Sequence, residues 1–152
     1  VEDKEVVMIT LALAQKLKEA GLVWRTSVHD FFAIPDRDMD NRVFVLSDMM
    51  VTMELLRGWP AVVFHGTAEW ASDYLLTHEA IWLPTESQLR EQLEEELAVR
   101  NGRFHQLQRQ DTEYACMVSL ANNPLDFVAD SASEAYGLAL LHLLNQEPGD
   151  KD

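Results

Sequence analysis

Hydrophobic residues recur every three or four positions in three separate stretches of the chain, which is the spacing of one face of an α-helix. The stretches run from about residue 4 to residue 20, from 85 to 100, and from 131 to 144. We therefore predict a helix in each of them. In the first two, the apolar positions are Val6, Ile9, Leu13, Leu17, Leu89, Leu93 and Leu97.

Capping residues mark where two of these helices begin. Thr85 with Gln88, and Ser131 with Glu134, match the capping box, in which two side chains bind the free backbone N–H groups of a helix start reciprocally. The helix after Thr85 has a narrow apolar line, so its glutamates are expected to face water. The helix after Ser131 is rich in Ala and Leu on most sides, which predicts deep burial.

Short runs of aromatic and β-branched residues predict strands between the helices. The run from 112 to 120 shows the clearest alternation, and a loop is predicted after it at residues 122–124. The runs at 22–24, 30–34 and 42–46 predict two or three strands, and the runs at 61–64, 80–83 and 103–109 predict one strand each.

Two segments are harder to assign. Residues 48–57 place three methionines, at 49, 50 and 53, and Leu56 on a helical stripe, while Val51 and Thr52 suit a strand, and we predict a short helix. Residues 67–76 are predicted to form another helix that begins at Thr67.

This order of elements predicts one globular α+β domain over residues 1–152, with a mixed or mainly antiparallel sheet packed by three to five helices. The stretch from 61 to 100 would also suit a right-handed parallel βαβ unit. Residues 145–152 are expected to form a disordered tail.

The net charge of the chain restricts its possible partners more than its composition does. Hydrophobic residues make up 47% of the 152 positions, which is enough for a core, but 26 acidic residues against 12 basic ones leave a net charge of −14. Such a field repels phosphate backbones and anionic lipid surfaces. We therefore predict no direct nucleic-acid binding and no membrane binding. The plainer reading is that the surplus carboxylates only keep the protein soluble.

The single cysteine, Cys116, cannot form a disulfide within the chain, which favours a reducing, cytoplasmic location. It falls on the apolar face of its predicted strand, where a thiol usually packs as a small hydrophobe. No catalytic residue and no cofactor are predicted, because no nucleophile motif or phosphate-binding loop occurs.

Alternate carboxylates at Asp36, Asp38 and Asp40 form a candidate metal site, because oxygen ligands in a loop suit a hard cation such as Ca²⁺. An EF-hand loop starting at Asp36 would need Gly and Glu where this chain has Asn41 and Ser47. A solvated acidic turn is the alternative.

His65, Gly66 and Thr67 form a candidate ligand-binding site, because they follow a predicted buried strand and open a predicted helix. Asp30 or Asp48 is expected to assist there. A purely structural role for His65 is the alternative.

The second half of the chain runs from a short strand and a Pro-Thr helix start, through a strand pair, to the Ala- and Leu-rich helix at 131–144. This layout resembles small uncharacterised bacterial and phage proteins that end in a similar helix. The resemblance covers about 60 residues. It implies an accessory or regulatory protein of bacterial or mobile-element origin, and it implies no catalytic residues.

Three hypotheses about function remain. The first is a non-enzymatic interaction module that binds a basic protein partner or a second copy of itself, for example as a homodimer. The second is a small-molecule-binding protein or hydrolase with its pocket near His65. The third is a DNA-mimic inhibitor, which needs carboxylates spaced like phosphates over one face.

Overall fold

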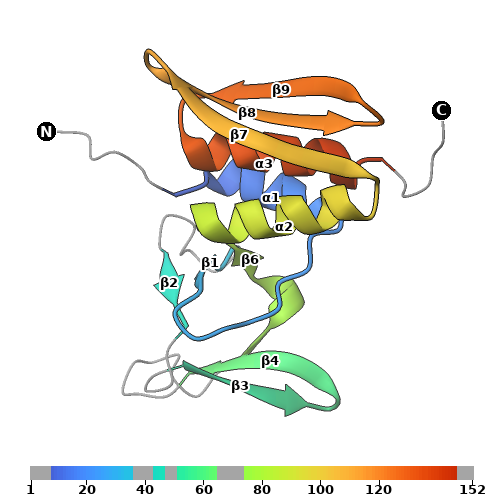
Figure 1. Ribbon diagram of the computed structural model, residues 1–152. Coiled ribbons are helices and arrows are strands. Elements are labelled where there is room, and N and C mark those ends of the chain that lie inside the picture. The colour runs from blue at the N-terminus through green and yellow to red at the C-terminus, as the bar shows by residue number, and fades with distance from the viewer. Residues whose placement is uncertain (1–7, 36–42, 47–50, 65–73, 147–152) are drawn as a thin grey trace, which may run out of the picture. The chain divides into compact units, whose positions relative to one another are not determined.

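The computed structural model describes residues 8–35, 43–46, 51–64 and 74–146, and these residues fall into two compact units (Figure 1). Unit 1 combines Val1–Leu22 with Pro84–Asp152, and unit 2 is Val23–Leu83. Within the described residues there are three α-helices and three antiparallel sheets, so the predicted α+β class is confirmed. That residues 1–152 act as one domain stays a prediction.

Unit 1 is an antiparallel sheet with helices on one face. The strands β7 (Gly102–Gln110), β8 (Glu113–Leu120) and β9 (Asn123–Ala129) pair in that order. The helices α1 (Leu11–Glu19), α2 (Glu86–Ala98) and α3 (Ala132–Leu144) all lie on the same side of this sheet (Figure 1). The opposite sheet face is not covered by a described element of this unit.

The predicted apolar lines make the core of unit 1. Leu89, Leu93 and Leu97 of α2 are buried, and Cys116 and Val118 of β8 are buried from the sheet side. Each fully buried leucine contributes roughly 1.5–3 kcal/mol to folding. Deep burial of α3 is confirmed at Ala135, Tyr136, Gly137, Ala139, Leu140 and Leu143, whereas Leu138 is exposed and Leu141 is half-buried.

The starts of α2 and α3 are capped at the predicted residues, whereas α1 begins at Leu11 after the cap residue Thr10, which the sequence pattern did not indicate. Gln88 N–H donates to Thr85 Oγ1 at 3.3 Å while Thr85 N–H donates to Gln88 Oε1 at 2.9 Å, so this capping box is complete. Glu134 N–H donates to Ser131 Oγ at 3.1 Å. The carboxylate of Glu134 binds the start of α1 instead of closing the second box.

The sequence prediction missed strand β9. The turn lies at Ala121 and Asn122, where φ is 50° and 67°, and not at 122–124. Leu125 and Phe127 then pair with the inward-facing Val118 and Cys116 of β8. Strand β9 is therefore the third strand of this sheet, and Leu125 and Phe127 continue the face formed by Val118 and Cys116.

Unit 2 contains two small sheets. In the first, β1 (Phe31–Ala33) lies between β2 (Phe44–Val45) and β6 (Ile81–Trp82). In the second, β4 (Trp59–Phe64) lies between β3 (Val51–Leu56) and β5 (Tyr74–Leu76), and the 3-10 helix η1 (Thr77–Glu79) follows. Their core is built from Phe32, Ile34, Leu46, Val62 and Ala80, against which Trp24, Phe44 and Met53 pack.

Two predictions in this unit are wrong for the residues that the structure describes. Residues 51–56 of the predicted short helix form strand β3, because six cross-strand pairs with β4 outweigh the helical spacing of the methionines. Residues 74–76 of the predicted second helix form strand β5. Of the two or three strands predicted within residues 22–46, two form, β1 and β2, while Trp24 packs on Phe32 with ring centroids 5.2 Å apart.

In the described parts of the chain, we find no helix with the length and apolar character needed to cross a membrane.

Candidate functional site

A pocket of about 780 Å³ lies in unit 1, where the N-terminal ends of α1 and α3 approach the first turn of α2 and one end of the β8–β9 pair. Its walls come from segments far apart in the sequence, at Thr10, Glu86, Glu113 and residues 128–134. The volume is in the range that holds small ligands or a few side chains of a partner.

Four carboxylates line this pocket: Glu86, Glu113, Asp130 and Glu134. The first three are exposed and Glu134 is half-buried. Among the lining residues that the structure describes, none is a lysine, arginine or histidine. The pocket is therefore a region of concentrated negative charge in a chain that is already strongly acidic.

Local helix chemistry explains two of the four carboxylates. Glu86 and Glu134 occupy the first turns of α2 and α3, where backbone N–H groups and the helix dipole favour a negative charge. Glu134 also accepts hydrogen bonds from Thr10 N–H at 3.0 Å and from Thr10 Oγ1 at 3.1 Å. The negative charge of Glu134 is therefore stabilised by hydrogen bonds from Thr10.

Glu113 and Asp130 have no such helical role. Glu113 begins β8, and Asp130 stands between β9 and the cap residue Ser131. Neither takes part in an ion pair with another residue in the described ranges. These two exposed carboxylates are available to a ligand.

The rest of the lining mixes hydroxyl groups and apolar surface. Thr10, Tyr114, Ser131 and Ser133 carry the hydroxyls. Val128 and Leu138 add apolar surface and remain 45% and 36% exposed. The pocket can therefore pack an aliphatic stem while its carboxylates accept hydrogen bonds.

His65, Gly66 and Thr67, the predicted ligand site, and Asp36, Asp38 and Asp40, the predicted metal site, all fall outside the described residues. Within the described residues, no group of three or more His, Cys, Asp or Glu side chains is arranged to hold a metal ion.

Asp30, expected to assist the His65 site, has a structural position in unit 2. It is buried, and its Oδ2 accepts hydrogen bonds from Trp24 Nε1 and from Ser27 N–H, both at 2.9 Å. These bonds hold the loop before β1 and orient Trp24 over the core.

The thiol of Cys116 is fully buried, in keeping with the inert role expected for it. Burial, with a smaller contribution from the charge of Asp126, raises the pKa of Cys116 from 9.0 to about 12. A thiol with such a pKa is not a nucleophile at neutral pH, since the reactive form is the thiolate.

Sequence reasoning missed the acidic pocket. Glu134 was predicted only as a capping residue, and the helix starts at Thr85 and Ser131 were the local signals near it. No local pattern indicates that the starts of three helices and one end of the β8–β9 pair come together in the folded unit. Comparison of the chain with protein families, with curated proteins and with solved structures found no match.

Proposed function

We propose that this protein is a non-enzymatic interaction module that binds a basic segment of a protein partner, and that the acidic pocket of unit 1 receives a lysine or arginine side chain. The observation that carries the proposal is the lining itself, with four carboxylates and no basic residue in the described ranges. The net charge of −14 adds a long-range attraction for basic partners.

The guanidinium and the aliphatic stem of an arginine side chain each fit one part of this lining. Its guanidinium donates paired hydrogen bonds to carboxylates such as Glu113 and Asp130. Its aliphatic stem packs on apolar surface such as Val128 and Leu138, because long cationic side chains bury their stems while the charged end stays among polar groups. A phosphate-bearing ligand would meet repulsion from the same carboxylates.

We infer a reducing, cytoplasmic setting for this binding. The chain has one cysteine, and that residue is buried as a neutral thiol. We further propose an accessory or regulatory role for this protein in a cell of bacterial type.

The direct experiment is a titration with a fluorescent hexa-arginine peptide, followed by anisotropy. We expect binding that weakens steadily between low and high salt, because exposed charges are screened within roughly 10 Å at 0.1 M salt. Binding that is independent of salt would contradict the electrostatic basis of the proposal.

Matched variants locate the binding site. Glu113→Gln and Asp130→Asn should each weaken peptide binding about two- to five-fold, which corresponds to the 0.4–1 kcal/mol of an exposed ion pair. Glu91→Gln removes the same charge from the exposed face of α2, outside the pocket, and should change binding less than two-fold. Equal losses in all three variants would mean that overall charge, and not the pocket, attracts the peptide.

A further inference from the structure

The β3–β4 hairpin of unit 2 ends in an exposed apolar tip that carries one cation. Residues 55–60 read Leu-Leu-Arg-Gly-Trp-Pro, with Arg57 and Gly58 in the turn. Leu55 is 73% exposed and Trp59 is 60% exposed, although both are large hydrophobic residues. Exposed Trp and Arg together are typical of the residues that dominate protein interfaces.

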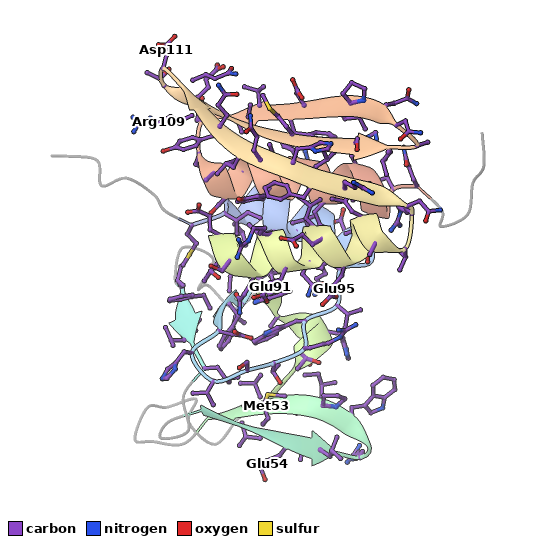
Figure 2. The ribbon with its side chains drawn as sticks, viewed as in Figure 1. Met53, Glu54, Glu91, Glu95, Arg109 and Asp111 are labelled. Atoms are coloured by element: carbon purple, nitrogen blue, oxygen red, sulfur yellow. The ribbon has the colours of Figure 1, made fainter. Side chains whose placement is uncertain are left out.

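The register of the hairpin explains why its tip is not used in the core. Met53 pairs with Val62, and both contribute to the core of unit 2. Met53 and Glu54 leave opposite faces of the strand (Figure 2). Beyond these pairs, Leu55 pairs with Pro60 and Leu56 with Trp59, past the buried part of the sheet.

The turn presents Arg57 at the outermost point of this hairpin. Arg57 has φ of 53° and Gly58 has φ of 84°, the two positive values of a two-residue turn that matches the strand twist. Arginine has no conformational advantage at that position, where asparagine is preferred. Its side chain is exposed, so its charge is available for an intermolecular contact.

We propose that the occupant of the acidic pocket is the hairpin tip of a second copy of this chain, with Arg57 among the carboxylates and Trp59 and Leu55 on the apolar rim. This inference rests on the proposed function of the pocket. Complementary charge carries it, because the pocket has four carboxylates and the tip has a cation flanked by apolar residues. Glu54 is the nearest acid on the strand and lies three positions before Arg57.

The proposed dimer is two-fold. In a two-fold dimer each copy provides one hairpin tip and one pocket, so the same contact forms twice and no free tip is left. The tip and the pocket belong to different compact units of the chain.

Sedimentation equilibrium from micromolar to millimolar concentration tests the inference. We expect the wild-type chain to form a dimer, and Arg57→Asn to weaken the dimer at least about ten-fold, as for an interface residue that dominates binding. Arg57→Asn suits the turn better than arginine does, so circular dichroism should show it fully folded. A wild-type monomer throughout, or a dimer that Arg57→Asn leaves unchanged, would overturn the inference.

A charge exchange gives the sharpest result. Arg57→Glu alone and the pocket double variant E113R/D130R alone should each be monomeric. Mixed in equal amounts, they should form a heterodimer, because both contacts then join opposite charges. The control double variant E91R/E95R changes the charge equally at two exposed positions of α2 that do not line the pocket, and it should dimerise like wild type (Figure 2). Failure of the mixture to associate would overturn the proposed pairing.

The two proposals can fail separately. If monomeric Arg57→Asn binds the hexa-arginine peptide through Glu113 and Asp130 while the wild-type chain never dimerises, the pocket binds basic segments and the hairpin is not one of them. If the chain dimerises through Arg57 but E113R/D130R has no effect, the hairpin has another docking site.

Discussion

The carboxylate of Glu134 accepts a hydrogen bond from the backbone N–H of Thr10 and another from its hydroxyl, although the two residues are 124 positions apart in the sequence. Thr10 is itself the cap residue of α1, and its hydroxyl oxygen accepts from Leu13 N–H at 3.3 Å. One acid in the first turn of α3 therefore satisfies free donors at the start of α1. The same bonds form one wall of the acidic pocket.

Replacing Glu134 with Ala should lower the free energy of unfolding by about 1–2 kcal/mol, because the α1 start loses a charged acceptor and α3 loses a first-turn acid. Thermal or urea denaturation measures the change. Glu86→Ala removes a comparable acid from the start of α2 and should cost less than about 1 kcal/mol. The double variant T10A/E134A should cost clearly less than the sum of the single changes, and full additivity would mean that the two residues are not coupled.

Gly137→Ala should destabilise the protein by about 1 kcal/mol, even though alanine is the better helix former by a similar amount. A Cβ at Gly137 would lie 2.6 Å from Leu13 Cδ2, where α1 packs against α3. Leu13 is buried and has little room to move. Urea denaturation of the variant provides the test, and a gain in stability would show that Leu13 can repack.

The thiol of Cys116 should not react with a thiol-specific reagent in the native protein at neutral pH, and it should react rapidly in denaturant. Its pKa is raised to about 12 in the folded state, so the folded form keeps its proton at pH values where the unfolded chain has lost it. Fast labelling under native conditions would contradict this buried, neutral state.

The same pKa predicts how stability depends on pH. Because the folded pKa lies above the unfolded value of 9.0, the contribution of Cys116 is fully present below pH 9.0 and is lost as the pH rises toward about 12. The wild-type chain should therefore lose stability faster than Cys116→Ala over this range, by at most about 1.4 kcal/mol for each pH unit. Parallel pH profiles of the two proteins would be inconsistent with the shift.

Arg57→Asn should raise the stability of unit 2 by up to about 1 kcal/mol, since arginine carries the cost of the left-handed conformation with φ of 53°. Leu56 and Trp59, which flank the turn, pair with each other across the strands, so the substitution should leave the hairpin unchanged. Chemical denaturation followed by tryptophan fluorescence measures the effect. Loss of stability would show that the Arg57 side chain makes contacts within its own copy.

The elements that could be predicted are those whose patterns are local. The capping box of Thr85 and Gln88 and the apolar line of Leu89, Leu93 and Leu97 are complete within one helix, and both are confirmed. Strand β3 was assigned to a helix because its methionines happen to have helical spacing, whereas its pairing with β4 is a non-local interaction. The local pattern that indicates a hairpin here is the Arg57-Gly58 turn. It is a weak indication, because arginine is unusual at the first position of such a turn.

Strand β9 is a second element that the local sequence pattern did not predict. Leu125, Phe127 and Ala129 alternate as a half-buried strand requires, but Asn123 and Pro124 at its start suggested a loop. Proline is tolerated in this position because β9 is an edge strand, and only the sheet order shows that.

The sequence by itself determined the α+β class, the three helices, the caps at Thr85 and Ser131, the burial of Cys116 and the strongly negative charge. These properties depend on residue type and on short-range spacing, which a linear pattern contains. The tertiary structure alone decided that Glu86, Glu113, Asp130 and Glu134 line one pocket, and that Leu55 and Trp59 stay exposed beside Arg57. Both depend on which distant segments meet and which are left uncovered, and hydrophobic packing settles that for a whole folded unit at once.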